Sequence, residues 1–162
     1  MKNLVIIRHA KSSWKEPLLN DHQRPLAERG LRDAPKMGNR LKKKGIIPDA
    51  MISSDAERAK ATALITAESL DFPKEKIRFT PYLYHASASD MLSEIKKTAD
   101  SVNTLFVFGH NPGENDLIWK LGGEIDNLPT SGQFGFKFDV NTWSDIGKKN
   151  AKFWFFDYPK KS

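Results

Sequence analysis

The most informative segment of this sequence is Asn3-Leu4-Val5-Ile6-Ile7-Arg8-His9, an apolar run that ends abruptly in an arginine–histidine pair. A short, continuous run of Val, Ile and Leu is typical of a strand that is buried on both faces in the middle of an α/β sheet. Ligands of open α/β sheets bind just outside the carboxyl ends of the strands. Arg8 and His9 are therefore candidate site residues, and the simpler alternative is a strand that merely ends in surface polar side chains.

The length and composition predict an ordinary globular protein. The chain has 162 residues, enough for one sizeable core, and we expect a single domain over residues 1–162. Because 39% of the residues are hydrophobic and 28% are charged, a disordered or fibrous chain is excluded. No apolar run approaches the roughly 20 residues of a membrane-spanning helix, and no signal peptide is recognisable. We therefore expect a cytoplasmic protein without a membrane partner.

Charge and cysteine content narrow the possible chemistry. The chain has no cysteine, which excludes disulfides, thiolate catalysis and cysteine zinc sites. The net charge of +6 favours an anionic partner. The basic residues are not interleaved with aromatic residues on a common face, so we expect no nucleic-acid partner.

The hydrophobic periodicity predicts alternating strands and helices. Leu31, Ala34, Gly38 and Leu41 are expected on the buried face of one helix, and Asn111 is expected to cap another, with Glu114 reaching back to the cap. The expected strands are 4–7, 50–53, 77–79, 104–108, 134–138 and 152–156, and the expected helices are 28–44, 56–70, 88–99 and 112–121. This order predicts a three-layer α/β/α sandwich, mainly parallel, in which the last two strands form an antiparallel edge.

A second buried strand ends in the same manner as the first. Residues 104–108 lead into Gly109-His110, and Arg58 follows the strand that ends near Ser53. If these strands are parallel neighbours, two histidines and two arginines converge at one edge of the sheet. Arginine offers a planar fork of donors that matches phosphate oxygens. A neutral imidazole in their midst can attack phosphorus and form a phosphohistidine that water hydrolyses. The arginines and a protonated second histidine would offset the charge of the phosphoryl oxygens.

A metal site is the rival chemistry for the same residues. It would use His9, His85, His110 and an aspartate, but no close histidine–carboxylate spacing appears in the sequence. We therefore expect neither a metal nor another cofactor.

These residues also carry a resemblance to a known family. The motifs are Arg8-His9-Ala10, Arg24-Pro25 with Arg29-Gly30, Ser53-Ser54 with Arg58-Ala59, and Gly109-His110-Asn111-Pro112. In this order they resemble the histidine phosphatase superfamily, and in particular its small phosphohistidine phosphatase branch, typified by SixA. The resemblance implies the phosphoglycerate mutase-like fold, with His9 as nucleophile and Arg8, Arg58 and His110 as phosphoryl-binding residues.

The sequence departs from the pattern of the superfamily at three positions. Ala10 replaces the glycine that follows the Arg-His pair, and Ala61 stands where glutamine is common. Near the segment where many members carry a glutamate that protonates the leaving group, this chain has His85, which is either a substitute acid or a rim histidine. Ser12 and Arg24 are further candidates for phosphate binding.

The resemblance implies a metal-independent phosphatase that acts through phospho-His9. Its expected substrate is phosphohistidine in a protein or a small phosphorylated metabolite, and a good leaving group of this kind needs little protonation. The alternative is a catalytically idle module of the same fold that binds phosphate or a phosphoprotein.

Overall fold

The structure, a computed structural model, describes residues 1–162 and contains one six-stranded sheet. The strand order is β3-β2-β4-β1-β5-β6. β1, β2, β3 and β4 run parallel to one another, β5 pairs antiparallel with β1, and β6 pairs antiparallel with β5. The strands are β1 (Lys2–Arg8), β2 (Ala50–Ser54), β3 (Arg78–Thr80), β4 (Thr104–Gly109), β5 (Gln133–Phe138) and β6 (Ala151–Asp157).

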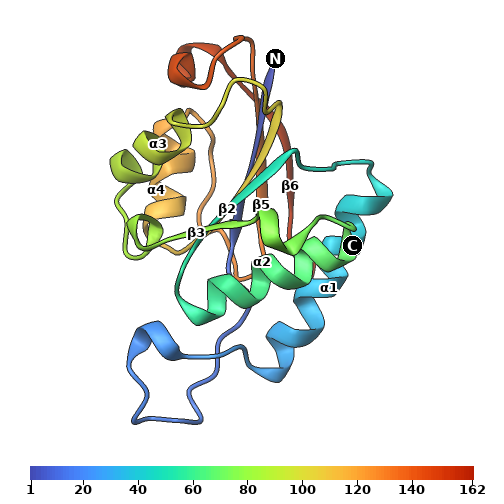
Figure 1. Cartoon of the computed structure of the whole chain (residues 1–162), viewed down its shortest axis with the longest axis vertical. Coiled ribbons are helices and arrows are strands. Elements are labelled where there is room, and N and C mark those ends of the chain that lie inside the picture. Colours follow the sequence, from blue (N-terminus) through green and yellow to red (C-terminus); the bar gives the residue numbers. More distant parts are fainter.

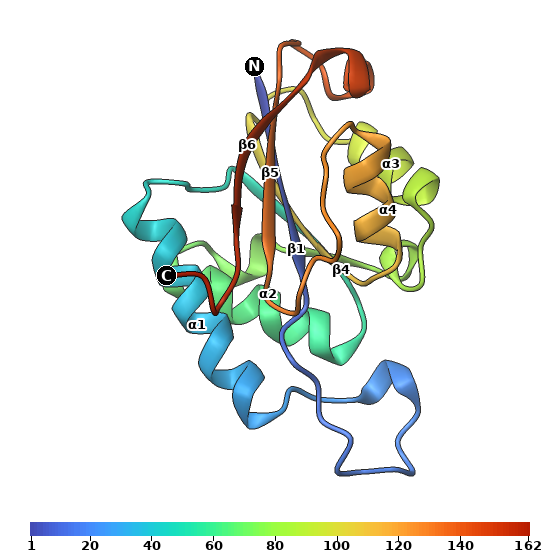
Figure 2. The ribbon, with the colours of Figure 1, turned by 180° about the vertical axis from the view of Figure 1, so that it is seen from behind.

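Four helices cover the two faces of the sheet (Figures 1 and 2). α1 (Glu28–Lys43) and α2 (Glu57–Ser69) lie on one face, and α3 (Ala88–Lys96) and α4 (Gly113–Lys120) lie on the other. The predicted α/β/α sandwich, mainly parallel with an antiparallel edge, is therefore confirmed. Single turns of 3₁₀ helix occur at η1 (Asp21–Gln23), η2 (Lys74–Lys76), η3 (Pro81–Leu83), η4 (Trp143–Asp145) and η5 (Lys148–Asn150). None of the helices has the length and apolar character needed to cross a bilayer.

β1 lies between two hydrophobic cores because its side chains alternate across the sheet. Leu4 and Ile6 belong to the core under α3 and α4, whereas Val5 and Ile7 belong to the core under α1 and α2. All four side chains are at most 2% exposed, so β1 forms a rigid base for the residues that follow it.

The helices on one face pack through small or flexible side chains. Ala59, Ala63 and Ala67 of α2 are fully buried, and short side chains of this kind let a helix lie close to the sheet. The expectation for Leu31 on α1 is wrong, since this side chain is 55% exposed. The buried stripe of α1 instead runs through Gly30, Ala34, Met37, Gly38 and Leu41, and Leu31 is about 100° around the helix from Gly30.

The start of α4 also differs from the expectation. The helix begins at Gly113, one residue later than predicted, and the Asn111 side chain accepts a hydrogen bond from the backbone N–H of Asn115. Glu114 does not reach back to the cap. Its side chain turns inward and lies fully buried against Gly109, because the helix starts directly over the end of β4.

A long loop between β1 and α1 covers the carboxyl end of the sheet (Figure 2). It is closed by an isolated bridge between Ser12 and Leu26. Arg24 holds the loop together, because its guanidinium stacks 3.2 Å from the ring centroid of Trp14 and donates to the Ser12 hydroxyl at 2.7 Å. These contacts place η1 over the strand ends.

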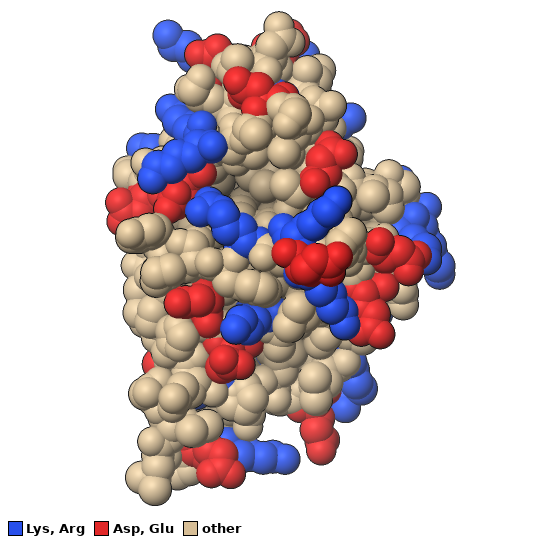
Figure 3. Space-filling view, in the orientation of Figure 1, with Lys and Arg blue, Asp and Glu red and all other residues tan.

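The opposite edge of the sheet is short at β3. β3 pairs with β2 only from Ile52 to Ser54, so Ala50 and Met51 have no neighbouring strand on that side. A hollow of about 330 Å³ lies there, and Figure 3 shows it between basic side chains. The basic residues that line it are Lys76, Arg78 and Lys97.

Candidate active site

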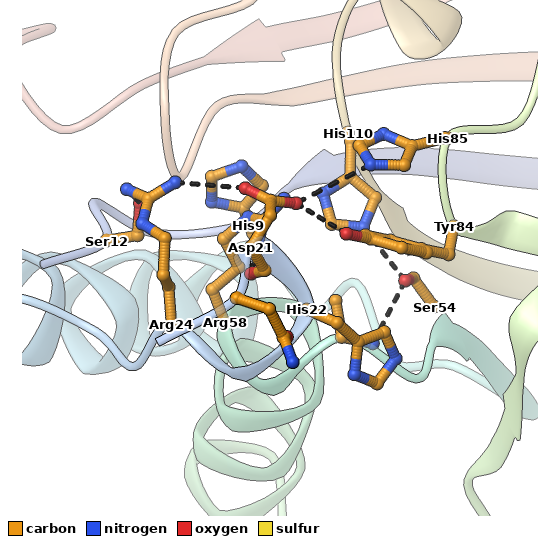
Figure 4. A network of polar contacts seen from close by, with 12 residues as sticks. His9, Ser12, Asp21, His22, Arg24, Ser54, Arg58, Tyr84, His85 and His110 are labelled. Atoms are coloured by element: carbon orange, nitrogen blue, oxygen red, sulfur yellow. Dashed lines mark hydrogen bonds and ion pairs between the residues drawn. The ribbon is translucent and has the colours of Figure 1, made fainter. Parts of the chain in front are cut away.

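The ends of two neighbouring parallel strands bring two histidines together. Arg8, the last residue of β1, pairs in register with Gly109, the last residue of β4. The next residues are His9 and His110, whose ring centroids lie 5.2 Å apart. Arg58 reaches the same place from the first turn of α2, which follows β2 (Figure 4). The four residues that the sequence predicts to converge therefore lie at or just after the ends of β1 and β4 and in the helix that follows β2, and these three strands are adjacent in the sheet.

The imidazole of His9 is held in a defined tautomer. Its Nδ1 lies 2.7 Å from the backbone oxygen of Ala10, and an oxygen acceptor there requires Nδ1 to carry the proton. Nε2 then keeps its lone pair. Burial, aided by the nearby charges of Arg58 and Arg8, lowers the pKa of His9 to about 4. The ring is therefore neutral at neutral pH, as a nucleophile at phosphorus must be.

His110 is also a neutral imidazole. Burial, together with the neighbouring His9 and Arg58, lowers its pKa to about 3, and the opposing effect of the Asp21 carboxylate is smaller. The expectation of a protonated second histidine concerns the site with a phosphoryl group bound, and it stays a prediction. A phosphoryl dianion would favour the charged form once bound.

The hydrogen bonds of His110 leave one ring nitrogen available. Nε2 lies 2.8 Å from the hydroxyl of Ser54, whereas Nδ1 is buried and has no partner. The Ser54 hydroxyl also accepts from the backbone N–H of Ala56, which suits it to donate its own proton to Nε2. In that arrangement Nδ1–H is an unused donor, and buried unused donors are costly unless a ligand satisfies them.

Arg8 is oriented by a backbone oxygen and has a buried acid nearby. Its Nη1 donates to the backbone oxygen of Leu128 at 2.9 Å, while its buried Nε has no partner. Glu114 is completely buried, and both of its carboxyl oxygens lack hydrogen-bond partners. Burial raises the pKa of Glu114 well above its usual range, although the charge of Arg8 opposes this shift.

Arg58 is occupied by the loop that covers the site. Its Nη1 donates to the backbone oxygen of Asp21 at 2.6 Å, and its Nη2 donates to the Asp21 carboxylate at 2.8 Å. The same carboxylate accepts from the Tyr84 hydroxyl at 2.6 Å and from Arg24 at 3.2 Å. A carboxylate with these partners occupies the kind of position that a phosphoryl group would take among arginine donors.

These contacts shift the pKa values of the two partners in opposite directions. Hydrogen bonds from Tyr84 and Arg58 hold the pKa of Asp21 well below its usual range, despite the opposing effect of desolvation. Burial and the Asp21 carboxylate raise the pKa of Tyr84. Asp21 is therefore ionised and cannot supply a proton to a leaving group.

His85 stands at the rim of the site. Its side chain is 65% exposed, its Nε2 lies 3.5 Å from the Asp21 carboxylate, and its ring centroid is 6.3 Å from that of His110. A cavity of about 320 Å³ opens between His85 and His110. His85 is thus close enough to meet the leaving group of a substrate held by His110.

Two other predicted phosphate-binding residues are used for structure. The guanidinium of Arg24 donates hydrogen bonds to the Ser12 hydroxyl, the Asp21 carboxylate and the backbone oxygen of Ser13. The Ser12 hydroxyl accepts one of these bonds. The structure therefore places Ser12 and Arg24 in the framework of the loop.

The sequence did not predict a role for the polar residues that surround Arg8, His9, Arg58 and His110. Ser54 contacts His110 and Tyr84 contacts Asp21. Ser54 belongs to the Ser53-Ser54 motif but had no predicted role, and nothing in the local sequence marks Tyr84. Asp21 had one usable signal, its position three residues before Arg24 in a loop too long to be a simple connection. No group of three or more His, Asp or Glu side chains is arranged to hold a metal ion.

Comparison with known proteins identifies the family of the chain. A model of the histidine phosphatase superfamily (branch 1) matches residues 4–98. An uncharacterised chloroplastic protein of Arabidopsis thaliana is 31% identical over 152 residues, which cover 89% of this chain and 70% of that protein. An uncharacterised protein of Mycobacterium leprae is 30% identical over 138 residues, 83% of each chain. The chain belongs to the histidine phosphatase superfamily.

The solved structures with the same fold include SixA proteins. SixA of Agrobacterium tumefaciens superposes with a TM-score of 0.83 and 23% identity, over 98% of each chain. The protein histidine phosphatase SixA complexed with tungstate superposes with a TM-score of 0.81 and 22% identity, over 97% of each chain. The predicted resemblance is confirmed, and membership of the superfamily supports phosphatase activity.

Proposed function

We propose that this protein is a metal-independent phosphatase that acts through a phosphohistidine intermediate on His9. The observation that carries the proposal is the buried pair His9 and His110, in which one ring offers a lone pair on Nε2 and the other offers an unused nitrogen. Arg8 and Arg58 supply positive charge on either side. A phosphoryl group is the ligand that these four side chains match best.

In the first step, Nε2 of His9 attacks phosphorus as the bond to the leaving nitrogen or oxygen breaks. His110 and the two arginines stabilise the charge on the phosphoryl oxygens. We assign His85 as the acid that gives a proton to the leaving group, because its exposed imidazole lines the cavity beside His110. In the second step water attacks phospho-His9, its proton passes to His85, and phosphate and His9 are released.

We propose phosphohistidine in a protein, or a small metabolite with a comparable leaving group, as the substrate. Cleavage of a P–N bond places less demand on the acid than cleavage of an alkyl phosphate. An exposed imidazole then suffices where many members of the superfamily carry a carboxylic acid. Tungstate, a phosphate-like oxyanion, is bound by one SixA with the same fold, which supports an oxyanion ligand for this chain as well.

The test is a rapid-quench experiment with labelled phosphoramidate in EDTA. We expect an acid-labile phosphoryl group on the wild-type protein, and neither label nor turnover in His9→Ala. His22→Ala is the matched histidine control, because His22 pairs with Asp55 and should leave the label intact. Turnover by His9→Ala at the wild-type rate would contradict the mechanism. Binding of vanadate without turnover of any phosphate compound would favour the idle binding module.

His85 is tested separately with substrates of graded leaving-group pKa. If it is the acid, His85→Ala lowers kcat/KM for phenyl phosphate much more than for p-nitrophenyl phosphate. An equal effect on both substrates would remove His85 from this role.

A further inference from the structure

The largest cleft of the molecule, of about 690 Å³, lies outside the candidate active site. It lies beside the junction of α1 with the chain segment that follows β6, and both views of the ribbon show these two parts side by side (Figures 1 and 2). Lys36 and Arg40 tie the two parts together through hydrogen bonds to backbone oxygens of residues 158–161. The floor is formed by Pro129 and Thr130, in the turn that precedes β5.

The two walls of the cleft carry mostly positive charge. The α1 wall contains Arg29, Asp33, Lys36 and Arg40, whose spacing of four, three and four residues places them on one helical face. Lys160 and Lys161 line the opposite wall. Five basic side chains and one acidic side chain therefore line the cleft.

Most of this charge is not neutralised within the protein. Arg40 pairs with Asp157 at 3.0 Å, and Arg29 lies 3.7 Å from Asp33. Lys36 and Lys161 donate instead to backbone oxygens, at 2.8 and 2.7 Å. A carbonyl fixes the position of an ammonium group but leaves its net charge in place.

The floor of the cleft is shared with the candidate active site. Leu128, just before the turn, accepts from Arg8, and the backbone N–H of Ser131, just after it, donates to the backbone oxygen of His9. On the cleft side, Arg29 donates to the Thr130 hydroxyl at 3.2 Å. A ligand in the cleft would therefore contact the same turn that positions Arg8 and His9.

We propose that this cleft binds a small polyanion, a molecule with several phosphate or carboxylate groups. Its volume lies within the usual range of small-molecule sites, and arginine and lysine on opposite walls suit anionic groups at more than one point. The anion is either a distal part of the substrate or a separate effector that acts through the 128–131 turn. Both of these sources rest on the proposed phosphatase activity, whereas binding itself does not.

Binding is tested by calorimetric titration of the full chain with inorganic tripolyphosphate. The cleft variant is Lys36→Glu/Lys160→Glu. The matched control is Lys120→Glu/Lys149→Glu, which changes the net charge equally at exposed positions outside the cleft. We expect the cleft variant to bind about tenfold more weakly than the control, since two attractive charges become repulsive. Equal affinities of the two variants would overturn the proposal.

Two further variants guard against a folding artefact. Lys160→Glu alone removes a side chain with no internal hydrogen bond, and it should weaken binding without lowering the melting temperature. Asp33→Asn removes the one repulsive carboxylate, so it should strengthen tripolyphosphate binding by about two- to threefold. Unchanged affinity in both variants would contradict a site in the cleft.

Inhibition kinetics distinguish the two sources of the anion. The assay measures hydrolysis of p-nitrophenyl phosphate in the presence of tripolyphosphate. If tripolyphosphate mimics an extended substrate, it raises the apparent KM for p-nitrophenyl phosphate, whereas an effector changes kcat. Either pattern must weaken in the cleft variant but not in the control. If the protein hydrolyses nothing yet still binds tripolyphosphate in the cleft, the phosphatase proposal fails and the binding site stands.

Discussion

Two neutral histidines lie side by side under arginine side chains, and burial is what keeps them neutral. The pKa of His9 falls to about 4 and that of His110 to about 3, both below the unperturbed value of 6.5. Below about pH 6.5 the unfolded chain therefore binds protons that the folded protein does not. The linkage predicts that the free energy of unfolding decreases as the pH falls from about 6.5 towards 4, by up to about 3 kcal/mol for His9 alone.

The same shift predicts that His9 remains a nucleophile in mild acid. In an NMR titration, the His9 ring should stay neutral at pH 5, and Arg58→Gln should raise its pKa because one nearby positive charge is removed. A midpoint near 6.5 in the wild-type protein would contradict the buried environment described above.

Asp21 gives a second prediction at the residue scale. Its carboxylate accepts a hydrogen bond from Arg58, so an incoming phosphate must exchange with it. Asp21→Asn removes the negative charge, and we expect inorganic phosphate to bind several-fold more tightly, measured as a lower inhibition constant. A weaker inhibition by phosphate would mean that Asp21 chiefly orients Arg58.

At the scale of elements, the start of α4 depends on one glycine. A Cβ at Gly113 would lie only 2.2 Å from the backbone oxygen of Ala86, next to His85. Gly113→Ala must therefore push the α4 terminus away from residues 85–86. We expect a loss of about 1–3 kcal/mol in the free energy of unfolding, together with reduced activity, because His110 and His85 flank this contact.

The matched control is Gly147→Ala, where a Cβ has open space. It should change the free energy of unfolding by less than about 0.5 kcal/mol. A similar loss in both variants would indicate that backbone freedom, and not the close contact with Ala86, explains the effect.

The strands and helices were predictable from sequence because their side-chain periods are strong. β1 and β4 appear as unbroken apolar runs, and the motifs after them predict which strand ends meet. The direction of Glu114 was not predictable, since the capping pattern with Asn111 favours an exposed carboxylate. Only the packing of α4 over the end of β4 turns this side chain inward.

The loop between β1 and α1 was beyond local prediction for a similar reason. The contacts of Asp21 with Arg58 and Tyr84 join residues 37 and 63 positions apart in the chain. No periodicity or short motif encodes contacts of that kind. The strand ends thus predict the centre of the candidate site, and long-range folding of the loop determines what covers it.

At the scale of the whole molecule, the two cores share one sheet. Phe106 packs in the core under α1 and α2, and Leu117 packs in the core under α3 and α4. We propose that residues 1–162 form one cooperative domain. Phe106→Ala should lower the free energy of unfolding by about 3–5 kcal/mol and Leu117→Ala by about 2–5 kcal/mol. Each variant should still unfold in a single calorimetric transition, at a lower temperature. Two separate calorimetric transitions in either variant would contradict a single domain.

The short β3 strand has a consequence for how copies of the protein meet. An open strand edge is a template for pairing with another chain, and here the unpaired part of β2 is bordered by Lys76, Arg78 and Lys97. The Glu94 carboxylate lies 4.0 Å from Arg78 and 3.4 Å from Lys97 and offsets part of this charge. We expect the remaining positive charges of two copies to repel one another if the copies approach edge to edge. Added salt should weaken this repulsion and so favour intermolecular sheet extension.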